Sequence, residues 1–310
     1  MEDRALEQHV ARGRAHLVSR SYHAAIEQLR SALSIDPDHA DAHALLALAL
    51  HDARRLYAAE LEAGRAITCD PESSLAHLAT ARVAVSARRW SDAHSHAEAA
   101  VSFAPDDAHV RVVAAAVLRD IGEEDAARGH IDAALALAPD DPSALEIAGW
   151  DARQRGDLAA ARRFAHAALE ADPGHEGALV LRGRLHLESG EVREAREHAL
   201  WALSEAPEDP AALALLVSVK MRQSPVMGLW WRFNSAIAAG GQSRMVAWLV
   251  GLFVVRLALG YLFGDLGMPL ARDAVMYGWL AFCVYTWVGP AMFRRALARE
   301  LESVELDPRF

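Results

Sequence analysis

Small apolar residues recur through the first two thirds of the chain with a period of 34 residues. One series of alanines comprises Ala25, Ala59, Ala93, Ala127, Ala161 and Ala195. A second series lies seven residues further on and comprises Ala32, Ala66, Ala100, Ala134, Ala168 and Ala202. A methyl side chain lets two helix backbones approach closely, whereas a larger one would overpack the contact. The pattern therefore predicts pairs of packed helices, repeated six times.

A proline closes each period. These residues are Pro37, Pro71, Pro105, Pro139, Pro173 and Pro207. Because proline lacks an N–H and cannot continue a helix, we expect each one to start a new helix. Turn signals such as Gly156-Asp157 separate the two helices inside a period. Helices of about 12–14 residues are near the limit for isolated helices in water, so stacking must supply most of the stability.

A 34-residue unit with these alanines and a closing proline resembles the tetratricopeptide repeat. The resemblance covers residues 6–209 and implies an all-α solenoid of six helix-turn-helix repeats with a concave groove. The family's small residue in the first helix is kept, as Gly13, Ala47, Ala81, Ala115, Gly149 and Gly183. The family's early aromatic residue is replaced by histidine in the first three units, at His9, His43 and His77.

The segment after the repeats is unusually apolar. A thirteenth helix is expected over 210–222, and its nearly continuous apolar surface predicts cover on both sides, so we expect the solenoid to lie near a membrane. From Pro225 to Ala239, Trp230 and Phe233 fall on one helical face, with Trp231 at its boundary. This arrangement predicts an amphipathic helix lying in the membrane interface. The alternative is an ordinary helix that packs on the last repeat.

Two apolar runs of twenty residues follow, 245–264 with one charge and 274–293 with none. A membrane-spanning helix needs about 20 largely apolar residues, so the runs predict two transmembrane helices arranged as a hairpin. The alternative is the buried core of a second soluble domain. Cations flank the outer ends of the hairpin, which predicts a multi-pass protein of the cell inner (cytoplasmic) membrane with both termini cytoplasmic.

The expected domains follow from these segments. They are a solenoid with its capping helix over 1–222, an interfacial helix and hinge over 223–241, and a transmembrane hairpin with a short cytoplasmic tail over 242–310.

Composition narrows the function. The chain has 42 acidic and 32 basic residues, and this net charge of −10 argues against a nucleic-acid partner. Two cysteines far apart in the sequence, Cys69 and Cys283, predict no disulfide and a reducing compartment. The first thirty residues lack the apolar core of a signal peptide, so we expect cytoplasmic repeats.

No catalytic or metal-binding pattern is found in the sequence. It has no glycine-rich phosphate loop and no nucleophile elbow, so we expect neither an enzyme nor a cofactor. His39 and His43 are four residues apart, a spacing that can hold a metal on a helix, but a pair needs further ligands. Capping of a helix start explains His39, and we expect no metal site.

The resemblance places partner peptides along the first helix of each unit. Transferred by repeat position, it predicts a protein-binding groove lined by Arg14, Leu48, His51, Leu78, Arg82, Val112, Arg119, Glu146, Trp150, Arg153 and Arg184. An apolar stripe flanked by arginine fits an extended or helical peptide with some acidic character. The alternative is that these arginines only form a solvated surface and bind no partner. Trp150 is the expected anchor, and a place in the core is its alternative.

Arg256 lies near the middle of the first apolar run. Burying a charge in a bilayer costs free energy, so a charged residue at this depth is a candidate functional residue. Arg256 either reaches the membrane interface, with Tyr285 or Thr286 as a hydrogen-bond partner, or pairs with an acid in the membrane helix of a partner.

These features predict a membrane-anchored scaffold or adaptor that binds a protein or peptide in the groove of its cytoplasmic repeats. The bilayer, a second copy of the chain or a membrane complex are the further partners considered. One alternative is a regulatory or assembly subunit of a membrane enzyme or transporter that acts mainly through its hairpin. The other is a soluble cochaperone, which the absence of the family's carboxylate-clamp lysines and asparagines disfavours.

Overall fold

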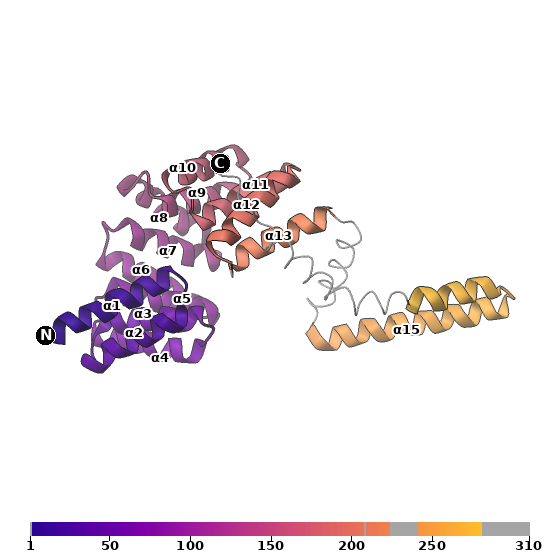
Figure 1. The fold of residues 1–310 in the computed structure, drawn as a ribbon, viewed down its shortest axis with the longest axis horizontal. Coiled ribbons are helices and arrows are strands. Elements are labelled where there is room, and N and C mark those ends of the chain that lie inside the picture. Colours follow the sequence, from indigo (N-terminus) through magenta and orange to yellow (C-terminus); the bar gives the residue numbers. More distant parts are fainter. Residues whose placement is uncertain (1, 208, 224–240, 281–310) are drawn as a thin grey trace. The chain divides into compact units, whose positions relative to one another are not determined.

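The computed structural model describes residues 2–207, 209–223 and 241–280, and these residues form helices joined by turns, without a strand (Figure 1). Contacts divide the chain into two units, Met1–Leu181 and Arg182–Phe310, and each is described by itself. The predicted all-α solenoid is confirmed.

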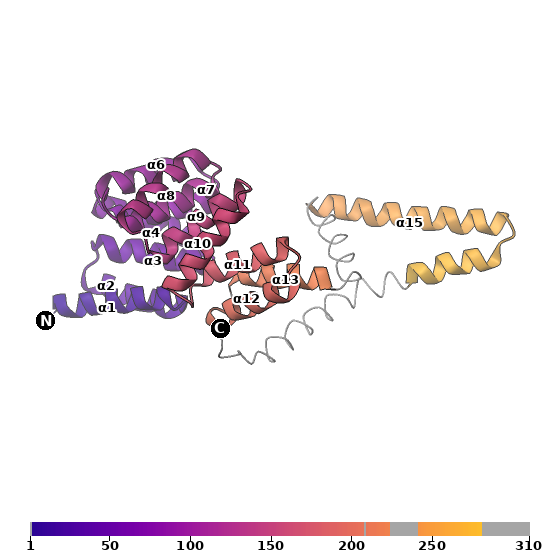
Figure 2. The same cartoon turned by 90° about the horizontal axis from the view of Figure 1, so that it is seen from above.

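The first unit alternates the first and second helices of successive repeats. Its helices are α1 (Glu2–Val18), α2 (Tyr22–Ile35), α3 (Ala40–Asp52), α4 (Leu56–Cys69), α5 (Ser74–Ser86), α6 (Trp90–Phe103), α7 (Ala108–Asp120), α8 (Glu124–Leu137), α9 (Pro142–Gln154), α10 (Leu158–Ala171) and the beginning of α11 (Glu176–Glu188). The two helices of a repeat pack on each other, and first helices contact first helices, as α3 contacts α5 and α5 contacts α7. Figure 2 shows this stack of helix pairs from above.

The alanine series mark the contacts between helices. All members of both series are buried. The position of Gly149 is tighter still, because a Cβ added there would lie 2.5 Å from Cδ2 of Leu181 and 3.3 Å from Cβ of Phe164. These close approaches confirm that the small residues set the distance between neighbouring helices.

The closing prolines occupy a different place from the one expected. Pro37 lies in the turn after α2, and α3 begins only at Ala40. His39 caps that helix, because its Nδ1 accepts a hydrogen bond from the N–H of Ala42 at 3.2 Å. The prolines therefore keep the chain out of helix between repeats, while the residues after them begin the next helix.

The turn inside each repeat passes through one residue with a left-handed backbone. In the later repeats this residue is Gly122, Gly156 or Gly190, with φ of 87°, 82° and 82°. The first three repeats have Arg20, Arg54 and Arg88 at the same repeat position, with φ of 53°, 60° and 58°. A left-handed residue with a side chain costs about 1–2 kcal/mol, so three repeats carry strain that glycine would relieve.

The second unit contains the rest of α11, α12 (Val192–Glu205), α13 (Pro210–Gln223) and α15 (Gly241–Asp265). The predicted thirteenth helix is α13, which packs on α12 and buries Leu215, Leu216 and Val219. After α15 a turn at Gly267 leads into a helix that covers 269–280. These two helices lie side by side, with Phe253 and Trp279 in ring contact at 6.0 Å (Figure 1).

No helix within the described ranges is both long enough and apolar enough to cross a membrane. The two transmembrane helices, the interfacial helix and the domain limits at 222 and 241 therefore stay predictions. Several residues assigned to them lie outside the described residues, namely Trp230, Trp231, Phe233, Tyr285 and Thr286.

Candidate functional site

The predicted groove residues all lie on the first helices of the repeats. They comprise Arg14 on α1, Leu48 and His51 on α3, Leu78 and Arg82 on α5, Val112 and Arg119 on α7, Glu146, Trp150 and Arg153 on α9, and Arg184 on α11. Leu78 and Val112 are only 4% and 8% exposed and belong to the hydrophobic core, so they offer little surface to a partner. The other nine are at least partly exposed.

Trp150 is held by its neighbours on α9. Its Nε1–H donates a hydrogen bond to Oε1 of Glu146 at 2.9 Å, and Cζ of Arg153 lies 5.5 Å from the centre of its ring. The tryptophan is partly exposed and is not part of the buried core. Its ring is thus fixed by contacts one turn away on both sides, which lowers the entropy lost when a partner binds.

Glu146 connects this tryptophan to the next repeat. Its Oε2 lies 3.9 Å from Nδ1 of His175, the residue just before α11. Its carboxylate also packs directly on Gly177, where an added Cβ would lie 2.3 Å from the carboxyl carbon. A carboxylate next to the first turn of α11 is favoured by the partial positive charge of that helix terminus. The sequence alone did not indicate this link between α9 and α11.

A polar network occupies the ends of α3 and α5. His51 bonds Oδ1 of Asp52 at 2.8 Å through Nδ1 and Oγ of Ser86 at 2.7 Å through Nε2. Arg82 donates to the same oxygen of Asp52 at 3.2 Å. Burial acts to raise the pKa of Asp52, but the hydrogen bond from His51 and the charge of Arg82 outweigh it and hold that pKa below its usual value. Two of the predicted groove residues, His51 and Arg82, thus already contact the carboxylate of Asp52.

An ion pair joins the first repeat to the beginning of the sixth. Arg20, in the turn before α2, donates to Oε2 of Glu176, the first residue of α11. The same charged groups act on Tyr22. Burial and the charge of Asp52 raise the pKa of its hydroxyl, while Arg20 and Arg82 act to lower it. No pattern in the sequence predicts this contact, because its two residues meet only through the winding of the whole first unit.

The histidines that replace the family's early aromatic residue in the first three repeats, His9, His43 and His77, are structural. Each bonds the same position of the second helix, in the pairs His9–Gln28 at 2.9 Å, His43–Glu62 at 2.6 Å and His77–His96 at 2.9 Å. The other ring nitrogens of His43 and His77 bond the carbonyl oxygens of the preceding closing prolines. These histidines therefore hold each helix pair to the turn before it. Within the described part of the chain, no group of three or more possible metal ligands is present.

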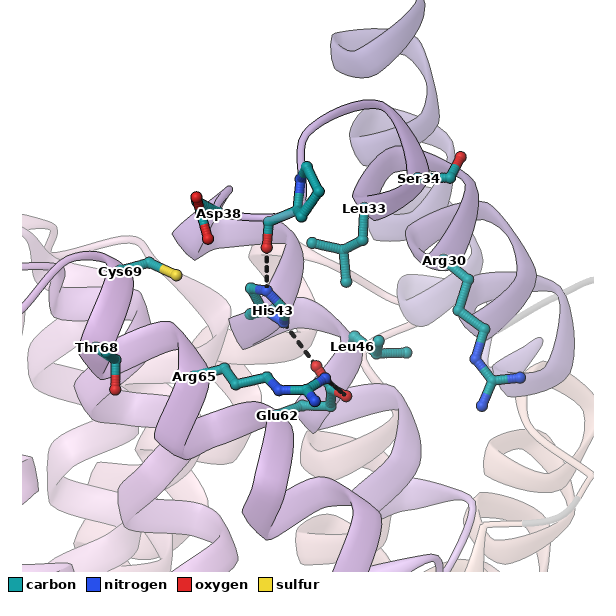
Figure 3. Close-up of a pocket in the computed structure, with 11 residues that line it drawn as sticks. Arg30, Leu33, Ser34, Asp38, His43, Leu46, Glu62, Arg65, Thr68 and Cys69 are labelled. Atoms are coloured by element: carbon teal, nitrogen blue, oxygen red, sulfur yellow. Dashed lines mark hydrogen bonds and ion pairs between the residues drawn. The ribbon is translucent and has the colours of Figure 1, made fainter.

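A cavity of about 690 Å³ lies between α2 and α4 (Figure 3). Leu46 is in its apolar wall, and the bonded pair of His43 and Glu62 faces it. Arg65 also pairs with Glu62, at 2.9 Å. Three of the polar groups around the cavity, His43, Glu62 and Arg65, are therefore bonded to one another.

Cys69 lies at the edge of the same cavity. Burial and the nearby charges of Asp38 and Asp36 raise the pKa of its thiol, so the reactive thiolate is disfavoured.

Arg256 lies on α15, with its Cζ 5.6 Å from the ring centre of Phe253. It also lines a cavity of about 500 Å³ together with Tyr261, Asp265 and Arg272. Its two predicted hydrogen-bond partners lie outside the described residues.

Comparison with known proteins identifies the repeats. Two family models, both described as tetratricopeptide repeat, match the chain. One matches residues 10–74 and 78–142, and the other matches residues 152–219. No curated protein matches the sequence significantly.

Several solved structures have a similar fold. One is the APC/C heterotetramer Cut9–Hcn1, with 15% identity and a TM-score of 0.54, over 69% of this chain and 42% of that chain. Another is PilW, described as a widely conserved type IV pilus biogenesis factor, with 15% identity and a TM-score of 0.51, over 68% and 98%. PilF of Pseudomonas aeruginosa has 20% identity and a TM-score of 0.48, over 69% and 97%. At such identities the similarity to Cut9–Hcn1 and to PilW shows the fold alone.

Proposed function

Because the chain belongs to the tetratricopeptide repeat family, we propose that it is a scaffold or adaptor that binds a protein or peptide partner along the first helices of its repeats. A solenoid of this family suggests a protein-interaction role, and the arrangement of Trp150 carries the proposal for this chain. This tryptophan is partly exposed, lies in the row of first-helix residues and is fixed by Glu146 and Arg153. A large aromatic side chain held in place is typical of an interface anchor.

The proposal includes anchoring in the cell inner membrane with the repeats on the cytoplasmic side. The apolar runs 245–264 and 274–293 and the cations that flank them support it. The many exposed apolar side chains on the described parts of α15 and of 269–280 support it as well, because so much exposed apolar surface is typical of an interaction site. They include Phe253, Val254, Val255, Leu257, Leu262, Leu270, Met276 and Leu280. This surface also favours the second candidate function, a subunit that assembles with a membrane complex through these helices.

Replacing Trp150 with alanine should weaken partner binding at least about tenfold, because truncating an interface anchor removes about 2 kcal/mol or more. Helical content should be unchanged. Arg184→Ala should weaken binding less, with a larger effect at low salt. Trp201→Ala, which truncates a partly exposed tryptophan on α12 and so outside the first helices, is the matched control. Binding is measured with detergent-solubilised protein against partners captured by crosslinking in native membranes, beside a thermal melt.

The outcome separates an interface anchor from a residue that only stabilises the fold, and one candidate function from the other. If Trp150→Ala mainly lowers the melting temperature and the folded remainder binds normally, the tryptophan stabilises the fold and does not anchor a partner. A chain ending at Gly240 should keep its partner if the repeats bind it. A subunit that acts through the later helices should lose its partner on the same truncation.

The topology predicts which cysteines an impermeant thiol reagent reaches in intact cells. Met268→Cys lies in the exposed turn between α15 and the next helix and should be labelled, because this turn should face outward. Ser102→Cys, on the exposed end of α6, should be labelled only after lysis. Both variants carry serine in place of Cys69 and Cys283. Labelling of Ser102→Cys alone would show the reverse orientation, and protection of both would refute an exposed loop.

A further inference from the structure

Four arginines in the second and third repeats oppose the local preferences of the backbone. Arg54 and Arg88 occupy left-handed positions where later repeats have glycine. Arg55 and Arg89 are the N-cap residues of α4 and α6 and cannot accept a capping hydrogen bond; at the same repeat position Asp157 caps α10, while Glu123 and Glu191 make no such bond. A cation at the start of a helix also opposes the helix dipole. Such local costs are typical of positions kept for a function.

Internal ion pairs explain only one of the four. Arg89 contacts Glu60 at 2.8 Å and Asp92 at 3.5 Å. Among the described residues, no ion pair is present for the other three, and all three are exposed. The corresponding turns of later repeats carry acids instead, in Gly122-Glu123-Glu124, Gly156-Asp157 and Gly190-Glu191. The positive charge is therefore a property of the early repeats.

Apolar and aromatic side chains stand out beside these arginines. Tyr57 and Val18 are 85% and 82% exposed, and Trp90 and Leu56 are 47% and 40% exposed. All four belong to the turns inside the first three repeats or to the helix ends next to them. We call this surface the turn edge, and it comprises Val18, Arg54, Arg55, Leu56, Tyr57, Arg88, Arg89 and Trp90.

We propose that the turn edge contacts an anionic bilayer surface. Arginine near such a surface is attracted by the lipid headgroups, and tyrosine and tryptophan favour the same depth. The residues lie at the tips of turns, and a flat surface can meet several tips at once, whereas a bound peptide is better held by a concave site. The inference rests on the proposed function in one respect, because membrane anchoring would hold the repeats close to a bilayer.

The test uses the full chain reconstituted into phosphatidylcholine vesicles with or without phosphatidylglycerol. An environment-sensitive fluorophore is attached to Ser91→Cys, next to Trp90, or to Ser102→Cys at the other end of α6, with serine at the two native cysteines. We expect phosphatidylglycerol to shift the emission to the blue at position 91 but not at 102. High salt should abolish the shift, because it screens exposed charges. The double variant Arg54→Glu and Arg88→Glu should abolish it too.

Two kinds of fluorescence result would overturn the inference. One is the absence of a lipid-dependent shift at position 91, or an equal shift at both positions. The other is a shift that poly-L-glutamate produces in detergent while phosphatidylglycerol vesicles produce none, which would assign the turn edge to an acidic protein. A chain that fails to insert into vesicles would refute the proposed membrane anchoring but not the proposed lipid contact of the turn edge. The same labelled chain is then mixed with preformed vesicles, where each arginine removed should lower partitioning roughly fivefold.

Arg88→Gly supplies an independent readout. Glycine relieves the left-handed strain, so the variant should melt at a higher temperature than the native chain while its lipid-dependent shift becomes smaller. A residue with a purely structural role would not give this combination. A lower melting temperature for Arg88→Gly would contradict the inference.

Discussion

Gly149→Leu should lower the stability of the first unit by about 2 kcal/mol or more, within the usual cost of overpacking. The Cβ of any larger residue would lie 2.5 Å from Cδ2 of Leu181, and Leu181 is fully buried. The backbone oxygen of Ala161 lies 3.6 Å from the same point and limits movement in another direction. Neither α10 nor α11 can therefore give way without losing its own packing. Leucine favours a helix more than glycine does, which offsets part of the loss.

Two other glycines provide the control, because they differ from Gly149 only in their surroundings. Gly64 on α4 and Gly129 on α8 are exposed, and an added Cβ would meet nothing within 4 Å. Gly64→Leu and Gly129→Leu should raise stability by up to about 1 kcal/mol through helix propensity. Denaturant unfolding gives the free energies, and hydrogen exchange should place the loss in the neighbouring helices. Equal stabilities for Gly149→Leu and Gly129→Leu would contradict the assigned contact.

Acidification should destabilise the second unit through His198. This histidine lies on α12 and stacks on His186 of α11, with ring centres 5.2 Å apart and planes at 12°. Its Nδ1 is buried and has no hydrogen-bond partner among the described residues. Burial, helped by the charges of His186 and Arg182, lowers the pKa of His198 from 6.5 to about 4.

The sign of the effect follows from the direction of this shift. The pKa of His198 is lower in the folded chain than in the unfolded one. On acidification the unfolded chain therefore binds the proton first, and the stability of the fold decreases as the pH is lowered. The full contribution is present above pH 6.5, and at about 1.4 kcal/mol per pKa unit roughly 3 kcal/mol is lost on reaching pH 4. Hydrogen exchange of residues 182–223, followed as a function of pH, measures this loss within the second unit.

Phe164 shows which substitution is the right control. Phe164 occupies the same repeat position as His198. Each packs against a glycine of the facing helix: a Cβ added at Gly149 would lie 3.3 Å from Cβ of Phe164, and one added at Gly183 would lie 3.3 Å from Cβ of His198. His198→Phe should therefore fit the same space and remove most of the pH dependence between pH 6.5 and 4. A profile that keeps its slope in this variant would mean that other groups cause the loss.

The fold was largely predictable because the repeat fixes both where helices pack and where they end. The buried alanines and the tight place of Gly149 follow from a period that can be read directly. The role of the closing prolines was less accessible, since the helix begins after the turn that they occupy. Leu78 and Val112 were assigned to the groove by repeat position, but burial at a helix surface also depends on how neighbouring repeats stack.

The candidate site was predictable in its residue types more than in its contacts. Trp150 and its neighbours Glu146 and Arg153 lie within one turn of each other, so helical spacing alone brings them together. The contact of Glu146 with Gly177 joins different repeats and depends on their relative rotation. The strain at Arg54 and Arg88 was hidden because the sequence shows an arginine without its backbone angle.

The pair formed by Arg20 and Glu176 restricts how this family member can evolve. Repeat arrays ordinarily gain or lose whole units easily, because each unit contacts only the next. Insertion or deletion of 34 residues between these two positions would rotate and translate α11 relative to the first turn and separate the two charges. The number of units between them is thus tied to a contact that spans 156 residues. Lineages that keep this pair should vary in repeat number only outside it.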